Sequence, residues 1–141
     1  KAYGLAGLRV GYGLVSPELA DTPDGATYDL VNTPFAVNKL ACRAALAALD
    51  DDDHVTESVE VARWSRAYMH EHLDARTWES GGNFVLAAVG DGARVTEAAK
   101  REGVIVRDCA SFGLPGCLRI TCGTRETTPE AVAVINEVLD R

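Results

Sequence analysis

The sequence predicts an α/β fold, and its second half carries the clearest pattern. Short runs rich in β-branched residues alternate there with amphipathic segments of helical period, which is typical of α/β proteins. We predict strands at 83–89, 104–107 and 117–123, and helices at 92–103 and from Thr127 onward. The first helix ends at Gly103 as its C-cap, and the box Thr127-Thr128-Pro129-Glu130 opens the second. From about residue 77 the chain therefore forms a small α/β unit.

The first half is predicted to hold one strand and two helices. Residues 7–15, GLRVGYGLV, mix β-branched and aromatic residues with glycine, as in a strand that another backbone or a ligand approaches closely. Thr33-Pro34 is typical of an N-cap followed by proline in the first helical turn. The acidic run at 50–53 ends that helix, and apolar spacing over 54–76 indicates a long helix between two subdomains.

Charge and hydropathy exclude two classes of partner. The 141 residues carry a net charge of −7, whereas nucleic acids and anionic membranes are bound by faces rich in lysine and arginine. The apolar runs are shorter than the roughly 18 residues that a membrane-spanning helix needs. We therefore expect a soluble, cytoplasmic protein that binds neither nucleic acid nor membrane.

The thiols and imidazoles show no metal-binding spacing. The four cysteines lack a CxxC pair and lie mostly in apolar segments, so we expect reduced, buried thiols at Cys42, Cys109, Cys117 and Cys122. His70 and His72 stand two apart in a predicted helix and would point to different sides. We interpret them as surface histidines and expect no bound metal.

Two cations lie in the glycine-rich first segment of this acidic chain. A neutral lysine amine forms a Schiff base with an aldehyde, and an arginine binds phosphate with its planar fork. Glycines let the backbone approach a bulky cofactor. Lys1 and Arg9 are therefore candidate binding residues, although their spacing alone is also compatible with a merely solvated lysine.

The amino-acid sequence of this segment resembles a motif of a known family. KAYGLAGLRVGY closely resembles the cofactor-lysine segment of fold-type I pyridoxal-phosphate-dependent aminotransferases, in particular the SKAxxLAGLRxGY pattern of the histidinol-phosphate aminotransferase family. The stretch VNTPFAVNKLACRAALAAL is similar to the helix that follows in that family. The resemblance implies that Lys1 holds pyridoxal 5'-phosphate and that Arg9 binds the phosphate of this cofactor.

A third segment, GVIVRDCASFGLPGCLRITCGT, resembles the C-terminal signature of the same family. In a strand over 118–122, Arg119 and Thr121 share the face opposite Leu118 and Ile120. The resemblance implies that Arg119 binds the carboxylate of the amino-acid partner, that Arg107 contacts the substrate phosphate and that Asn83 lies near the substrate. The residues alone leave two alternatives open. Arg119 could form an ion pair with a nearby carboxylate, and Asn83 could simply be a polar residue at the start of a strand.

The resemblance covers essentially the whole chain but only the C-terminal part of a complete enzyme. It implies that residues 1–53 complete the mostly parallel sheet of the cofactor-binding large domain, that 54–76 form a connecting helix and that 77–141 form the small C-terminal α/β domain. It also implies a homodimer when the protein is intact. The chain alone is expected to be inactive, since the remaining cofactor contacts would lie outside it.

The implied activity is transamination between histidinol phosphate and 2-oxoglutarate in histidine biosynthesis, with Lys1 as the general acid and base. The substrates are then small amino and 2-oxo acids. Three alternatives stay open: a threonine-phosphate decarboxylase, because such enzymes also carry a loop like RDC at 107–109; a broad-specificity amino-acid aminotransferase; and a non-catalytic α/β binding domain.

Overall fold

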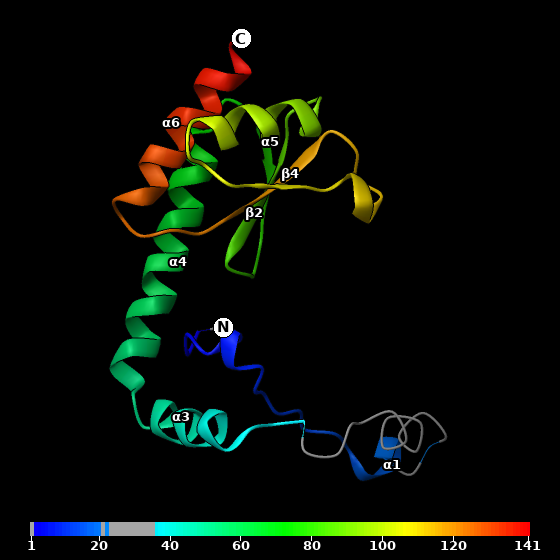
Figure 1. The fold of residues 1–141 in the computed structure, drawn as a ribbon, viewed down its shortest axis with the longest axis vertical. Coiled ribbons are helices and arrows are strands. Elements are labelled where there is room, and N and C mark those ends of the chain that lie inside the picture. The colour runs from blue at the N-terminus through cyan, green and yellow to red at the C-terminus, as the bar shows by residue number, and fades with distance from the viewer. Residues whose placement is uncertain (1, 21, 23–35) are drawn as a thin grey trace. The chain divides into compact units, whose positions relative to one another are not determined.

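The computed structural model describes residues 2–20, 22 and 36–141 (Figure 1). The chain divides into two compact units, residues 1–56 and 57–141, which we describe separately. The domain bounds that the sequence suggests, at 53 and 76, refer to a full-length enzyme and stay a prediction.

The described residues of the first unit form helices and irregular segments. It contains the 3-10 helix η1 (Ala6–Leu8), α1 (Pro17–Ala20), α3 (Lys39–Leu49) and the start of α4 (Asp52–His72). The strand predicted for 7–15 is wrong, because none of the described residues of this unit lies in a strand. A strand needs a neighbour for its N–H and C=O groups, and the described part of the unit offers none.

Helix α3 begins at Lys39, directly after its N-cap Asn38. The Asn38 side chain accepts a hydrogen bond from the Ala41 amide at 2.8 Å and caps the first turn. The predicted start at Thr33-Pro34 lies outside the described residues. The prediction that the acidic run separates two helices is confirmed, because α3 ends at Leu49 and Asp51 Oδ1 accepts from the His54 amide at 3.1 Å in the first turn of α4.

Helix α4 ends at His72, four residues before the predicted end at Arg76, and α6 (Thr127–Leu139) is the reason. Asn136 Nδ2 donates to the His72 carbonyl at 2.8 Å, and Asn136 Oδ1 accepts from the Asp74 amide at 3.0 Å. This side chain satisfies backbone groups that a helix end leaves free. The chain then enters β1 (Arg76–Trp78), a strand that we did not predict.

The second unit contains a four-stranded antiparallel sheet in the order β1-β2-β4-β3. The predicted strands at 83–89 and 117–123 are confirmed as β2 (Phe84–Ala88) and β4 (Cys117–Thr121). The third, predicted at 104–107, pairs only through its end, as β3 (Arg107–Asp108). The α/β fold class is confirmed.

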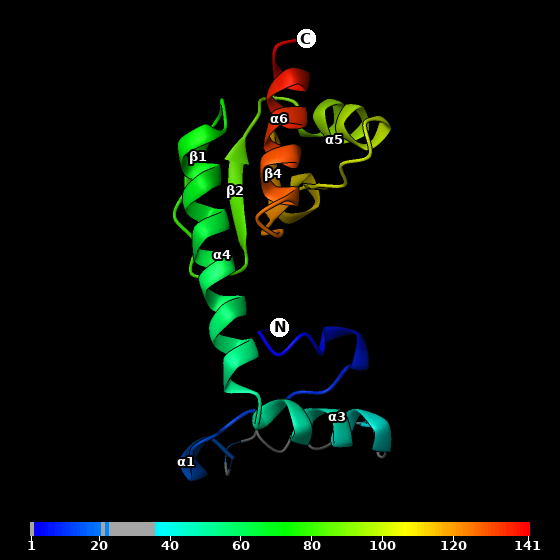
Figure 2. The ribbon, with the colours of Figure 1, turned by 90° about the vertical axis from the view of Figure 1, so that its left-hand side faces the viewer.

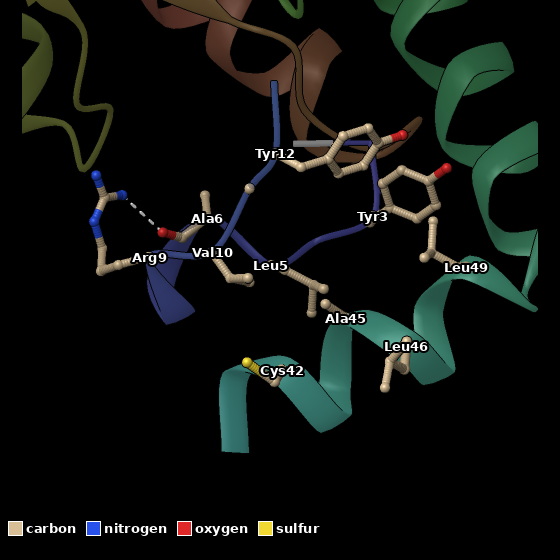
Figure 3. A pocket seen from close by; sticks show the side chains of 11 residues that line it. Tyr3, Leu5, Ala6, Arg9, Val10, Tyr12, Cys42, Ala45, Leu46 and Leu49 are labelled. Carbon is tan, nitrogen blue, oxygen red and sulfur yellow. Dashed lines mark hydrogen bonds between the residues drawn. The ribbon is translucent and has the colours of Figure 1, made fainter. Parts of the chain in front are cut away.

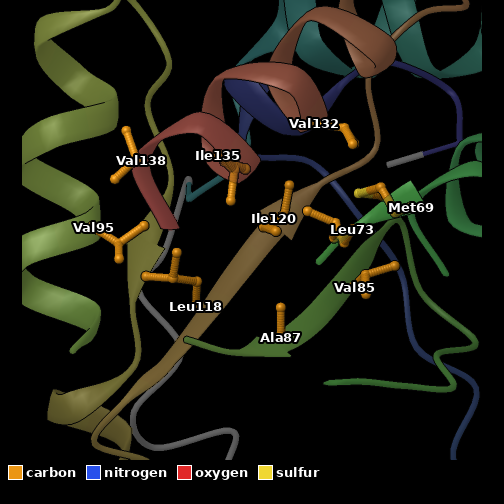
Figure 4. Packing of buried hydrophobic residues seen from close by; sticks show 10 residues of the cluster. All are labelled: Met69, Leu73, Val85, Ala87, Val95, Leu118, Ile120, Val132, Ile135 and Val138. Carbon is orange, nitrogen blue, oxygen red and sulfur yellow. The ribbon is translucent and has the colours of Figure 1, made fainter. Parts of the chain in front are cut away.

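Three helices cover one face of this sheet. Helix α6 contacts α5 (Gly92–Arg101) and bonds to α4, so it lies between them (Figure 2). The core lies between these helices and the strands and contains Met69, Leu73, Val85, Ala87, Val95, Leu118, Ile120, Val132, Ile135 and Val138 (Figure 4). Alternation along β4 buries Leu118 and Ile120 and leaves Arg119 on the face that carries no helix.

The predicted end of α5 is correct, whereas the predicted capping box at the start of α6 is not. Gly103 follows α5 in the left-handed conformation at φ +86°, and the Gly103 and Val104 amides donate back to Lys100 and Ala99, as in a Schellman motif. The box predicted over 127–130 is wrong. Thr124 and Thr127 form it instead, because the amide of each donates to the hydroxyl of the other, at 2.9 Å and 3.2 Å.

Candidate functional site

Arg9 ends the helix η1 in an unusual backbone conformation. It is the C-cap of η1 with φ 54° and ψ 39°, and among the described residues no other non-glycine residue has a positive φ. Such a conformation costs about 1–3 kcal/mol and occurs preferentially at functional sites. Arg9 Nη1 donates to the Ala6 carbonyl at 2.8 Å (Figure 3). This contact uses one of five guanidinium N–H groups, and Arg9 forms no ion pair with a described residue.

An open pocket of about 820 Å³ lies beside this segment, within the first unit. Residues from the N-terminal segment and from α3 line it: Tyr3, Leu5, Ala6, Arg9, Val10, Gly11, Tyr12, Cys42, Ala45, Leu46 and Leu49 (Figure 3). The rings of Tyr3 and Tyr12 lie at one end and the Arg9 guanidinium at the other. Arg9 is the only charged residue among these lining residues, so the pocket is apolar with one cation at its margin.

Lys1, the candidate catalytic residue, lies outside the described residues. Its role therefore remains a prediction from the sequence.

Two further candidates, Arg107 and Arg119, are brought together in the second unit. They are directly opposite each other on the antiparallel strands β3 and β4, and both are exposed. Residues opposite each other in such a pair have Cα atoms about 4.5–5.5 Å apart, and like charges placed there destabilise the sheet. Neither arginine forms an ion pair with a described residue. Among these residues, the alternative that Arg119 pairs with a local carboxylate is therefore excluded.

Aromatic rings lie under both guanidiniums. Arg119 Cζ is 5.6 Å from the centroid of Phe84, and Arg107 Cζ is 5.4 Å from the centroid of Phe112. Both distances lie within the range of cation–π attraction. The two arginines thus keep their N–H groups available for anions while their charge rests against an aromatic face.

Asn83 lies just before β2 and beside the end of β4. Its carbonyl accepts a hydrogen bond from the Cys122 amide at 2.9 Å, which continues the pairing of β2 with β4. With the described residues, its side-chain amide forms no hydrogen bond. Asn83 therefore lies next to the sheet that carries the two arginines, with its side-chain amide available for a ligand.

Two predictions about cysteines and histidines need correction. Cys42 is exposed and Cys117 and Cys122 are half-buried, so Cys109 alone of the four cysteines is buried as predicted, and all four thiols are free. Burial raises the pKa of the Cys122 thiol, whose sulfur donates to the Ala62 carbonyl at 3.6 Å. His70 is half-buried rather than exposed, and its Nδ1 lies 2.7 Å from Thr77 Oγ1, whereas His72 is exposed as predicted.

The described part of the chain contains no group of three or more His, Cys, Asp or Glu side chains that is placed to hold a metal ion. In the same residues, every helix is too short or too polar to cross a membrane.

The rings of Phe84 and Phe112 are site features that the sequence analysis missed. Phe84 shares a face with Arg119 because it pairs with Thr121, two residues further along β4. That relation depends on the register of two strands far apart in the chain. The sequence contains the arginines and the aromatic residues, but it does not show the strand pairing that brings Phe84 next to Arg119.

The first unit carries Arg9 beside an apolar pocket, and the second carries the pair Arg107 and Arg119. Residues 1–135 match the family model described as aminotransferase class I and II, and the chain belongs to this family.

The relatives of this chain narrow the comparison. It is 64% identical over 139 residues to the histidinol-phosphate aminotransferase of Haloferax volcanii and 65% identical over 139 residues to that of Halorubrum lacusprofundi. Each alignment covers 99% of this chain and 37% of the relative. The chain thus spans well under half the length of the curated relatives that it matches.

A solved structure supports the same comparison. The histidinol-phosphate aminotransferase from Sinorhizobium meliloti, in complex with pyridoxal-5'-phosphate, resembles this chain with a TM-score of 0.75 and 27% identity. The match covers 99% of this chain and 39% of the other. The family predicted from the sequence is confirmed.

Proposed function

We propose that the protein containing this chain is a pyridoxal-phosphate-dependent aminotransferase that transfers an amino group from histidinol phosphate to 2-oxoglutarate. The observation that carries the proposal is the cross-strand pair Arg107 and Arg119, two cations on one sheet face without carboxylate partners among the described residues. The two substrates bring two kinds of anion, a phosphate and carboxylates. The names of the relatives at 64% and 65% identity support this choice of substrate.

The residues of the first segment fit the cofactor. The Arg9 guanidinium keeps several N–H donors and lies at the margin of an apolar pocket, as a cofactor with an aromatic ring and a phosphate group requires. Pyridoxal phosphate, when bound, supplies an aldehyde that condenses with amines and a ring that withdraws electrons. Lys1 would hold this group, and Arg9 would bind its phosphate.

Lys1 has a second proposed role, in proton transfer. Its amine, in the neutral form, would take the proton from the α-carbon of the amino substrate and later return a proton. A single amine can do both because taking the proton converts it into the ammonium acid that gives the proton back. Replacing Lys1 by alanine would therefore remove cofactor attachment and proton transfer together.

The second unit would supply substrate binding. Arg119 would bind a carboxylate of the amino-acid partner through its planar fork, and Arg107 would bind the phosphate of histidinol phosphate. The Asn83 amide, without a hydrogen bond to described residues, would contact the substrate as well. The proposal also includes the homodimer that the family resemblance implies and the cytoplasmic location expected from charge and hydropathy.

The experiment that tests this proposal uses the full-length protein that contains this chain. It is purified with pyridoxal phosphate, and its visible absorption is recorded on adding histidinol phosphate. We expect the absorption of the lysine-bound cofactor to disappear and 2-oxoglutarate to restore it. A cofactor band that ignores histidinol phosphate would favour the decarboxylase or a broad-specificity aminotransferase, and carbon dioxide release from threonine phosphate would separate these two. A protein that binds no cofactor would leave the non-catalytic alternative.

A further inference from the structure

We propose that Phe84 and Phe112 are positioning residues, each of which holds one of the two cross-strand guanidiniums so that Arg119 and Arg107 receive different anions. The inference rests on the proposed function, because it assigns a carboxylate to one arginine and a phosphate to the other. It adds two residues for which neither the sequence pattern nor the family resemblance gave a role.

The starting point is an unfavourable arrangement of charge. Arg107 and Arg119 are paired across β3 and β4, and no described carboxylate pairs with either. Two long cationic side chains in this position repel each other and have many rotamers available. A site that distinguishes two anions needs something that separates the guanidiniums and fixes each in one place.

The two rings separate the guanidiniums by drawing them toward different elements. Phe84 belongs to β2, the neighbour of β4 on the side away from β3, so Arg119 leans over the centre of the sheet. Phe112 belongs to the short helix η2 (Ala110–Phe112), so Arg107 leans over the loop that follows its own strand. The rings carry no formal charge and leave every N–H group of the guanidiniums free for an anion.

The ring of Phe84 is fixed by its surroundings. A Cβ atom at Gly82 would lie 2.9 Å from Phe84 Cε1 and 3.2 Å from Phe84 Cδ1, so the ring lies directly against the Gly82 backbone. Arg66 Nη1 donates to the Gly82 carbonyl at 2.6 Å and holds this turn against α4. Residue 82 must therefore lack a side chain for Phe84 to occupy its place under Arg119.

The ring of Phe112 is carried by a compact turn. The Phe112 and Leu114 amides both donate to the Cys109 carbonyl, at 2.9 Å and 3.2 Å, and Gly113 closes the turn with φ +76°. Phe112 is 58% exposed, and its ring lies against the Arg107 guanidinium. Its replacement should disturb Arg107 far more than the core.

The sheet also offers a matched control. Arg76 Cζ lies 5.0 Å from the centroid of the Trp78 ring on the edge strand β1. This is the same kind of contact, but we assign no substrate group to Arg76. Trp78→Leu therefore tests whether loss of an arginine–aromatic contact in this sheet has a general effect.

The experiment measures steady-state kinetics of the full-length enzyme with 2-oxoglutarate and with histidinol phosphate. Phe84→Leu should raise KM for 2-oxoglutarate about two- to fivefold and leave KM for histidinol phosphate nearly unchanged. Phe112→Leu should show the opposite selectivity. Phe84→Tyr keeps the ring and should restore the wild-type KM, Gly82→Ala should behave as Phe84→Leu, and Trp78→Leu should change neither constant.

If Phe84→Leu and Phe112→Leu change both KM values equally, or change neither, the inference is overturned. An active wild type would still support the proposed function in that case. If the wild-type protein transfers no amino group, the proposed function fails. The inference is then tested by measuring how the variants bind the two anions. Calorimetric titration with 2-oxoglutarate and with inorganic phosphate should then show the same opposite selectivity of the two variants. Thermal unfolding of each variant establishes that it is folded under the conditions used.

Discussion

The hydroxyl oxygens of Ser65 in α4 and Thr128 in α6 lie 2.8 Å apart, and both residues are buried. The bond joins two helices that cover the same face of the sheet. Asn136 makes a second link between the same helices, at the end of α4. The Asn136 contacts fix where α4 ends and hence where β1 begins.

The first prediction concerns this bond. Ser65→Ala leaves the buried Thr128 hydroxyl without its partner and should lower the free energy of unfolding by about 1–3 kcal/mol. Urea denaturation of the chain measures the loss. The double variant Ser65→Ala with Thr128→Val removes both hydroxyls and should recover part of it. Simple additivity of the two single substitutions would contradict the coupling.

The second prediction concerns the core. Leu118 is fully buried between the sheet and its helices, so Leu118→Ala should lower the free energy of unfolding by about 2–5 kcal/mol. Ile105, which is 85% exposed, provides the control, and Ile105→Ala should change stability by less than about 0.5 kcal/mol. A comparable loss from both substitutions in the same denaturation assay would show that the core is assigned wrongly.

The third prediction concerns pH. Because burial raises the pKa of the Cys122 thiol, the folded chain keeps this proton where the unfolded chain loses it, above about pH 8.5. This contribution to stability is fully present below the unfolded-state pKa and is lost as the pH rises from there through the folded-state pKa. Denaturation midpoints between about pH 7 and pH 10 should therefore fall more steeply for the wild type than for Cys122→Ala. The difference at neutral pH measures the packing cost of the substitution, and parallel curves would contradict the prediction.

The fourth prediction separates the two arginines in the full-length enzyme. Arg119→Ala should raise KM for glutamate and for 2-oxoglutarate about 10- to 100-fold, because a hydrogen bond to a charged group contributes about 1.5–3 kcal/mol. Arg107→Ala should have its larger effect on histidinol phosphate. Each variant serves as the control for the other, and identical profiles would show that the arginines do not have separate anions.

Local sequence patterns predicted the elements that local forces determine. β2 and β4 follow from their alternation, and the end of α5 follows from Gly103. The strand β1 and the end of α4 were missed because they depend on Asn136, more than 60 residues away in the chain. The strand predicted over 7–15 failed because a strand also requires a pairing partner.

The candidate site divides in the same way. Arg107 and Arg119 were identified from sequence motifs, and the resemblance to a family supplied their roles. Their position opposite each other and the placement of Phe84 depend on strand register, and the placement of Phe112 depends on the turn after β3; all three were visible only in the structure. Arg9 was predicted as a phosphate ligand, but its left-handed backbone could not be read from its neighbours.

The central claim is that this chain belongs to an enzyme that moves an amino group by means of Lys1. The most direct test incubates the full-length protein, loaded with pyridoxal phosphate, with histidinol phosphate and 2-oxoglutarate and measures the glutamate formed. Our account predicts catalytic glutamate formation by the wild type and none by Lys1→Ala. A wild type that binds the cofactor but forms no glutamate, or a Lys1→Ala variant as active as the wild type, would contradict it.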